Sequence, residues 1–511
     1  MYFSKILPIF AATKKIAMEK DKKSMFVLPL ISCEMSPFTK ACLIDKMNAY
    51  KQIYNRLVAQ VNRALRNNEE LLKAYKERKI KKHELLNSLA IDYDYKGKEK
   101  YFGITEYGIG YAAYAMIKED MGGGKTYNSL INTKNISPVA SEIVKAVEKV
   151  IKEYDGEKIP QLKIKEKCNI ISYGLSNKQF IGLSSIDLAN SLIEVKNAGP
   201  VKFHINSKHY YEMFAMGCTM KQICFVRKEI RGKEKIYLQF VFDGVPYMKD
   251  AHLGKGQVSI DIGPKTFYIL YKDENGVFGK KEIKLDSVEN IDREISKLQR
   301  KIDRSRRSTT PENYNEDGTP KRKGERIKFN ESKRNKRSIA ELKDMQRKLT
   351  AKKEIAENIA IREILSLGDN FKIEYSPGMM KSWSARKKTT TVKANGKNSS
   401  KKRYGKSILN SAPYRFLEKL ERKAELLGAT VTEVPTKWGC TGFDHTDGTY
   451  TKHGVCVRKV TLSNGNTHNR DFHSCFNIMY ANVEKGAKEK TFYIDQMNND
   501  YEAYCKCDLD V

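Results

Sequence analysis

The sequence lacks long hydrophobic runs and a regular cysteine framework. No apolar stretch approaches the roughly 18 residues of a membrane span. The N-terminal stretch ILPIFAA is short for a signal peptide, and basic residues follow it at once. The 10 cysteines are scattered along the chain, which is typical of free thiols in a reducing compartment. We therefore expect a cytoplasmic protein that does not bind a membrane.

Acidic residues are scarce relative to basic ones. There are 62 Asp and Glu residues against 94 Lys and Arg, a formal net charge of +32. Such an excess predicts a polyanionic partner, although a generally basic proteome or a ribosome-associated protein would also show it. Because no lipid signal is present, we favour nucleic acid over a membrane surface. At 511 residues the chain is also too long for one core, so we expect several domains.

A phosphate-binding motif is incomplete. The segment MGGGKTYN, residues 121–128, ends in the GKT of a P-loop, but Glu119 stands where that motif needs a further glycine. The residues before the segment have helical rather than strand composition. We therefore interpret it as a flexible turn and not as a nucleoside triphosphate site.

The N-terminal half is expected to combine strands and helices. Residues 22–33 have strand composition, and a helix is predicted to start at Ser36 and Pro37, where apolar residues begin to recur at spacings of three and four. Helical character continues with breaks to about residue 155. Strand composition with turns returns at residues 200–244. This order predicts a β-barrel-like platform with a helical domain inserted in it.

The C-terminal half has a mixed α/β pattern that begins near residue 255. Turn residues, apolar alternation and charged amphipathic stretches mark its elements. The predicted elements are strands at 257–263, 266–273, 370–376 and 429–435, helices at 286–303 and 333–366, a mobile loop at 307–326, and a helix with Ser411 as N-cap and Gly428 past its end.

The segment 381–410 contains ten basic residues and no acidic one. Such a run is usually a solvated loop, but beside a nucleic-acid site it is equally well interpreted as a lid that becomes ordered on phosphate. The candidate nucleic-acid-binding residues are Lys387, Lys388, Lys401, Lys402 and, further along the chain, Arg470.

Three carboxylates stand at the edges of predicted elements. Asp261 lies in an apolar strand, Glu374 ends another strand, and Asp471 lies in the first turn of a predicted helix. Each one alone can be a cap, a salt bridge or a turn residue. Together they form a ribonuclease-H-type arrangement, in which converging carboxylates repel one another unless divalent ions neutralise them. Oxygen ligands suit Mg²⁺ or Mn²⁺, and two such ions can activate water against a phosphodiester.

The segments SIDIG, IEYSPGMMKSW and HNRDFHSCFNI resemble the three split RuvC motifs of the TnpB nucleases and the compact type V CRISPR effectors. The resemblance covers about residues 255–480. It implies a multidomain α+β protein: an RNase H-like (RuvC) α/β nuclease domain split by insertions, and a β-barrel wedge domain with an inserted helical recognition domain. By resemblance, Asp261, Glu374 and Asp471 are the catalytic ligands of two Mg²⁺ or Mn²⁺ ions.

The function implied by the resemblance is RNA-guided cleavage of DNA in the prokaryotic cytosol, with a guide RNA and target double-stranded DNA as partners. A guided DNA-binding regulator that no longer cuts is one alternative, but such a relative should have lost a motif carboxylate. An unguided RuvC-type resolvase or transposase is another, and those lack the large basic N-terminal half. The implied domains are the wedge (1–35 and 159–253), the recognition domain (36–158), the nuclease (254–434 and 469–511) and a zinc-finger-like insertion that binds target nucleic acid (435–468).

This sequence departs from the family at the four-cysteine zinc site before the third motif. Cys440 remains, but Phe443, Thr461 and Asn464 stand near the positions of the other ligands. Thiolates and imidazoles suit tetrahedral zinc, so a substitute set is chemically possible, although its spacing is irregular. We expect packing around Trp438 and Phe443, rather than zinc, to hold this insertion. The substitute set consists of Cys440, His445, His453 and Cys456.

Overall fold

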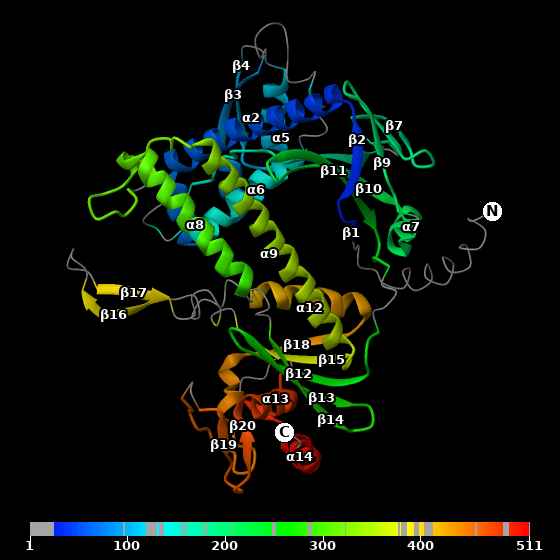
Figure 1. Cartoon of the computed structure of the whole chain (residues 1–511), viewed down its shortest axis with the longest axis vertical. Helices are drawn as coiled ribbons and strands as arrows, with labels where there is room; N and C mark the ends of the chain where they lie inside the picture. Colours follow the sequence, from blue (N-terminus) through cyan, green and yellow to red (C-terminus); the bar gives the residue numbers. More distant parts are fainter. Residues whose placement is uncertain are drawn as a thin grey trace. The chain divides into compact units, whose positions relative to one another are not determined.

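The chain folds into two compact units, residues 1–248 and 249–511, shown in Figure 1. Each is described by itself. Together they bear out the expected multidomain organisation of helices and sheets. The computed structural model describes residues 25–95, 98–118, 130–131, 137–154, 156, 159, 161–176, 179–180, 182–206, 208–247, 252–284, 289–321, 323–376, 379, 386–392, 398–402, 412–454, 457–483 and 490–509.

A nine-stranded sheet forms one part of the first unit. Its strands are β1 (Met25–Val27), β2 (Ile31–Met35), β5 (Ile170–Ser176), β6 (Gln179–Phe180), β7 (Leu183–Asp187), β8 (Leu192–Val195), β9 (Gly199–Phe203), β10 (Met220–Ile230) and β11 (Lys233–Asp243). The order is β6-β5-β10-β11-β2-β9-β8-β7, with β1 also paired to β11. No pairing joins β6 to β7 among the described strands, so closure into a barrel stays a prediction.

Two sequence predictions in this sheet region need correction. The strand predicted at 22–33 is two strands, β1 and β2, separated by a segment that contains Pro29, which has no N–H to donate to a ladder. The strand composition of 200–217 also conceals a short helix, α7 (Tyr210–Met216). Its buried Glu212 accepts a hydrogen bond from the backbone N–H of Asn206 at 2.7 Å, which stabilises the turn into this helix.

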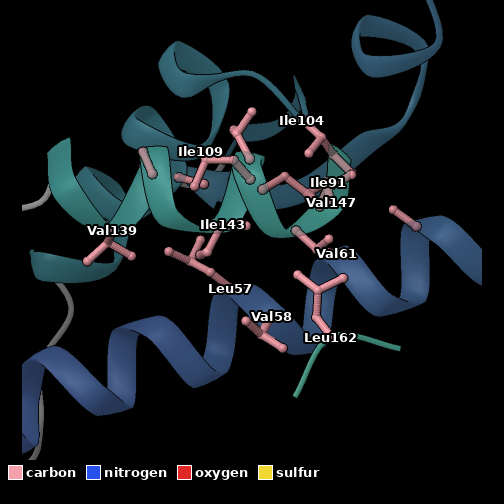
Figure 2. Packing of buried hydrophobic residues seen from close by; sticks show 14 of the residues in the cluster. Leu57, Val58, Val61, Ile91, Ile104, Ile109, Val139, Ile143, Val147 and Leu162 are labelled. Carbon is pink, nitrogen blue, oxygen red and sulfur yellow. The ribbon is translucent and has the colours of Figure 1, made fainter. Parts of the chain in front are cut away.

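Helices form the other part of the first unit. They are α2 (Pro37–Asn67), α3 (Glu69–Lys76), α4 (Lys82–Ser88), α5 (Glu106–Ile117) and α6 (Ser137–Glu153). Helix α2 starts as predicted, because the Ser36 hydroxyl accepts the N–H of Thr39 at 3.0 Å. Figure 2 shows Leu57 and Val61 of this helix packed with Ile143 of α6.

The predicted run of helices is interrupted by a hairpin of β3 (Ala90–Tyr95) and β4 (Lys98–Gly103). The segment alternates Asp and Tyr, a period of two that favours a strand over a helix. Helical character is expected to continue to about residue 155 with breaks, and this hairpin is one of those breaks.

The second unit is built on a five-stranded mixed sheet in the order β14-β13-β12-β15-β18. Strands β12, β13 and β14 are antiparallel neighbours, whereas β12, β15 and β18 run parallel. The four strands predicted at 257–263, 266–273, 370–376 and 429–435 are confirmed as β12 (Gly256–Ile262), β13 (Thr266–Asp273), β15 (Asn370–Glu374) and β18 (Thr430–Val434). The fifth strand is β14 (Phe278–Lys284).

Helices cover both faces of this sheet (Figure 1). Apolar residues that alternate along the strands pack on one face with α9 (Lys333–Leu365) and α12 (Pro413–Leu427). The other face packs with α13 (Arg470–Tyr480) and α14 (Ile494–Leu509). Helix α9 also packs along α8 (Glu289–Thr309). Within the described ranges, no helix is both long and apolar enough to cross a lipid bilayer.

The predicted end of helix α12 is confirmed, whereas its predicted start and the loop predicted at 307–326 need correction. Helix α12 ends at Gly428, whose φ of 87° is the left-handed conformation that glycine favours. Its N-cap is Ala412 rather than the predicted Ser411, which lies outside the described residues. The loop predicted as mobile is instead tied together by the buried Asn313, whose amide donates to Ile327 O at 2.9 Å and accepts from Ile327 N at 2.8 Å.

The remaining elements of the second unit are short. They are the 3-10 helices η4 (Pro311–Asn313), η5 (Lys323–Glu325), η6 (Thr436–Trp438) and η7 (Cys440–Gly442), and the strand pairs β16 (Arg386–Val392) with β17 (Asn398–Lys402), β19 (Lys459–Thr461) with β20 (Thr467–Asn469), and β21 (Ala481–Asn482) with β22 (Thr491–Phe492).

Candidate active site

The parallel register of two central strands places Asp261 beside Glu374. Ile260 of β12 is paired with Ile373 of β15, so Asp261 and Glu374 are the next residue of each strand. Neighbouring strands are roughly 4.8 Å apart. Because Ile260 and Ile373 face the core under α9 and α12, alternation directs the two acids to the face that α13 covers.

Helix α13 brings the third acid to the same face. The Asn469 side chain caps the helix by accepting the N–H of Asp471 at 3.0 Å. At the other end of the helix, the Lys372 ammonium of β15 donates to Met479 O and Ala481 O, both at 2.9 Å. Helix α13 is therefore secured to the strand that carries Glu374, and Asp471 lies in its first turn, as predicted.

Polar groups of the chain favour the charged form of two of the carboxylates. The Ser474 side chain, one turn after Asp471, lowers the pKa of Asp261. The backbone N–H of Cys440 likewise lowers the pKa of Glu374. In turn, the buried Asn477 amide of α13 donates to Cys440 O at 2.8 Å and so holds this turn in place.

The three acids are electrostatically linked. Burial raises the pKa of Glu374 above its usual range, and the charge of Asp261 raises it further. Burial also raises the pKa of Asp261, and the charge of Asp471 adds to this effect, whereas the Ser474 hydrogen bond and the Arg470 charge oppose it. Charge buried in this way costs free energy that a bound cation would recover.

Asp471 is paired with two arginines. Its Oδ1 accepts Arg470 Nη2 at 2.6 Å and Nε at 3.0 Å, and its Oδ2 accepts Arg458 Nη1 at 2.8 Å. The Arg470 guanidinium is buried and also donates to Gly454 O at 3.1 Å. Arg470 thus points toward protein groups, and its predicted contact with nucleic acid stays a prediction.

The carboxylates of Asp261, Glu374 and Asp471 are of the kind that binds a hard divalent cation, but they do not surround a common ion position. Across the described ranges, no three His, Cys, Asp or Glu side chains form a group that could hold a metal ion as they stand. Carboxylate oxygens are the ligands that Mg²⁺ and Mn²⁺ prefer. The arginine pairs of Asp471 would have to be exchanged for the ion before all three acids could bind it.

The structure describes three of the four proposed zinc ligands and does not bring those three together. Cys440 packs in an apolar cluster with Val434 and Trp438, whereas His445 lies against Tyr501, with ring centroids 4.6 Å apart. His453 is half-buried in a loop, and Cys456 lies outside the described residues. The three described candidates, Cys440, His445 and His453, form no metal-binding group.

Cys440 instead belongs to the surroundings of the carboxylates. Burial and the nearby charges of Glu374 and Asp261 raise the pKa of its thiol well above the usual range. Zinc binds the thiolate, so a thiol held in its protonated form is a poor ligand. Cys440 was a zinc candidate in the sequence, and only the folded chain shows that its backbone N–H supports Glu374.

The aromatic residues expected to anchor the insertion are buried. Trp438 is 3% exposed and Phe443 is 5% exposed. They lie in two different clusters, because Trp438 packs with Ile478 and Phe443 stacks on Phe492 with centroids 4.0 Å apart. Packing against α13 and β22 thus supports this region, rather than a small separate core.

Elemental analysis of protein purified without added metal should find well under one zinc per chain. The described candidates do not converge, and a structural zinc site needs four ligands arranged around the ion. Addition of a chelator should leave the melting temperature unchanged for the same reason. A full equivalent of tightly held zinc, lost in a Cys440→Ser, His445→Ala double variant, would contradict this expectation.

Two residues near the acids were not found from the sequence. Ser474 follows Asp471 by three positions, so the helical spacing alone could have placed it on the same side. Arg458 is 13 positions before Asp471, and its approach depends on the β19–β20 hairpin, where Arg470 N donates to Arg458 O at 2.9 Å. Only tertiary structure could reveal that contact.

The basic segment 381–410 contains a two-stranded hairpin of β16 and β17. Lys387 is the register partner of Lys401, and Arg386 is the partner of Lys402. The backbone register thus pairs basic positions of the sequence across the two strands, and their contact with a polyanion stays a prediction. The hairpin's predicted position as a lid beside the carboxylates stays a prediction.

No family model matches this sequence, and no curated protein matches it. Among solved structures, the chain is similar to a Cas12f1–sgRNA–target DNA complex, with 13% identity, a TM-score of 0.38, and coverage of 90% of this chain and 98% of that one. It is also similar to a CRISPR-Cas12f ternary complex, with 11% identity, a TM-score of 0.24, and coverage of 86% and 82%.

Proposed function

We propose that this protein is an RNA-guided DNA endonuclease that hydrolyses phosphodiester bonds at Asp261, Glu374 and Asp471. The observation that carries the proposal is the meeting of two acids from adjacent parallel strands with a third from the covering helix. The resemblance of the three surrounding segments to split RuvC motifs supports the same reaction, and a net charge of +32 supports nucleic acid as the partner.

The residues of the site have distinct proposed tasks. Asp261, Glu374 and Asp471 would hold two Mg²⁺ or Mn²⁺ ions, which when bound neutralise the acids and polarise the scissile phosphodiester. Ser474 orients Asp261, and the Cys440 N–H orients Glu374. Asn477 keeps the Cys440 turn against α13. These contacts fix ligand positions before substrate arrives, which is what catalysis by positioning requires.

The basic charge is proposed to bind a guide RNA and target double-stranded DNA. Lys and Arg contacts to phosphates would supply affinity, and base pairing with the guide would select the target. In this proposal, residues 36–158 form the recognition domain, residues 1–35 and 159–253 the wedge, and residues 254–434 and 469–511 the RuvC nuclease, with 435–468 as the insertion between them. The protein would act in the prokaryotic cytosol.

Sequencing of RNA that copurifies with the protein tests this proposal. A discrete RNA species should be bound, and the purified complex should cut double-stranded DNA complementary to it when Mg²⁺ is added. DNA without complementarity should stay intact. Equal cleavage after RNase treatment would instead indicate an unguided resolvase or transposase. Guided binding without cleavage would indicate a regulator, which the three retained carboxylates do not favour.

A further inference from the structure

Arg458 makes a contact that the proposed chemistry does not use. It reaches from the insertion, just before β19, to Asp471 in the first turn of α13. Its Nη1 lies 2.8 Å from Oδ2 of Asp471, a residue that the proposed function makes a metal ligand. The other oxygen, Oδ1, is engaged by Arg470. A cation that approaches Asp471 Oδ2 therefore competes with Arg458 for this oxygen.

The two arginines differ in how firmly the chain holds them. The Arg470 side chain is 11% exposed and is also bound to Gly454 O. The Arg458 side chain is 61% exposed, although its carboxylate partner is only 7% exposed. The Arg458 backbone is fixed, since its carbonyl accepts the N–H of Arg470. Arg458 can thus leave Asp471 by side-chain rotation alone, while Arg470 stays in place.

We propose that Arg458 is a positioning residue that competes with a divalent ion for Asp471 Oδ2 and moves to a phosphate of the substrate strand when the ion enters. This inference rests on the proposed function. A guanidinium N–H and a metal ion cannot both take the same lone-pair direction, and a guanidinium binds phosphate as readily as carboxylate. Nucleic acid would therefore draw Arg458 away and favour metal binding.

In this exchange, binding of the metal ion and binding of nucleic acid strengthen each other. If a phosphate that binds Arg458 raises the affinity for the metal ion, linkage requires that the ion raise the affinity for that phosphate by the same factor. Arg458 belongs to the insertion that the resemblance assigns to target nucleic acid. The proposed consequence is that the site binds metal weakly until a strand is present, which limits cleavage of other phosphodiesters.

Binding of Mn²⁺ to protein without nucleic acid, followed by electron paramagnetic resonance of the free ion, tests the competition without measuring activity. Arg458→Ala should bind Mn²⁺ about fivefold more tightly than wild type, since an ion pair with one exposed partner is worth at most about that factor. Arg458→Lys, which keeps a cation near Asp471, should lie close to wild type. Unchanged or weaker Mn²⁺ binding in Arg458→Ala would overturn the proposal, because a merely structural arginine would not restrain metal affinity.

Arg347→Ala is the matched control. Arg347 is 44% exposed and lies 2.8 Å from the 8% exposed Asp344 on α9, so this pair closely resembles the Arg458–Asp471 pair. Its loss should leave Mn²⁺ affinity unchanged. Adding Asp261→Asn to Arg458→Ala separates the two hypotheses. If Mn²⁺ binding persists in that double variant, the metal site of the proposed function is wrong, whatever the effect of Arg458.

The phosphate half of the proposal is tested by fluorescence anisotropy with a labelled oligothymidylate strand. Ca²⁺ should increase the strand affinity of wild type by a factor several times larger than in Arg458→Ala, because only wild type has an arginine to release. Ca²⁺ that bridges the carboxylates and a phosphate increases the strand affinity of both proteins. This contribution cancels when the gain of wild type is divided by the gain of Arg458→Ala. Equal gains in the two proteins would overturn the transfer of Arg458 to phosphate.

Discussion

Asp261→Asn should reduce Mg²⁺-dependent DNA cleavage by at least about 10³-fold. Stabilisation of transition-state charge by a bound metal is worth several kcal/mol, and roughly 4 kcal/mol corresponds to a thousandfold in rate. Glu374→Gln and Asp471→Asn should have effects of the same order. Affinity for RNA and DNA should survive in all three variants, since phosphate contacts elsewhere supply it. Cleavage assays under single-turnover conditions and gel-shift titrations measure the two quantities.

The same variant should not destabilise the protein in the absence of divalent ions. Asp261 is a half-buried charge near Glu374 and Asp471, and asparagine keeps its shape and a side-chain oxygen as acceptor while removing the repulsion. Its melting temperature in EDTA should therefore equal or exceed that of wild type. Mg²⁺ should raise the melting temperature of wild type but not of Asp261→Asn.

Asp500→Asn is the control for this prediction. Asp500 lies on α14 in the same unit, and its carboxylate accepts from Lys272 Nζ at 2.6 Å and from the Tyr480 hydroxyl. Its replacement should lower the melting temperature in EDTA and leave cleavage intact at permissive temperature. A near wild-type rate in Asp261→Asn, or a stability loss as large as that of Asp500→Asn, would show that Asp261 is a structural residue.

Replacement of Lys387, Lys388, Lys401 and Lys402 by Gln should weaken strand binding most at low salt. Each phosphate contact contributes about 0.7 to the slope of log K against log salt for single strands. If all four lysines contact phosphate, the slope should fall by about 3.

The control for the hairpin variant removes four lysines whose charges are already balanced. Each lies within 4 Å of a glutamate in the second unit, so its replacement should change the salt slope little. A slope unchanged in the hairpin variant, or changed equally in both, would indicate that segment 381–410 is a solvated loop. The control lysines are Lys255, Lys281, Lys284 and Lys506.

Local features of this protein followed from the sequence because their causes are local. The start of α2 at Ser36, the end of α12 at Gly428 and the strand alternation around Asp261 depend on capping, backbone conformation and side-chain period. Where a local signal was overlooked, as at Pro29 between β1 and β2, one strand was predicted and two are present.

Spatial relations between distant residues required the tertiary structure. Asp261 and Glu374 are neighbours because burial of the apolar face sets the parallel register of β12 and β15 across 113 residues of sequence. The same packing places the backbone N–H of Cys440 beside Glu374 and the guanidinium of Arg458 beside the carboxylate of Asp471. The sequence by itself determined which acids can carry the chemistry. Only the folded chain decided what surrounds them, because those contacts depend on how buried surfaces fit together and not on spacing along the chain.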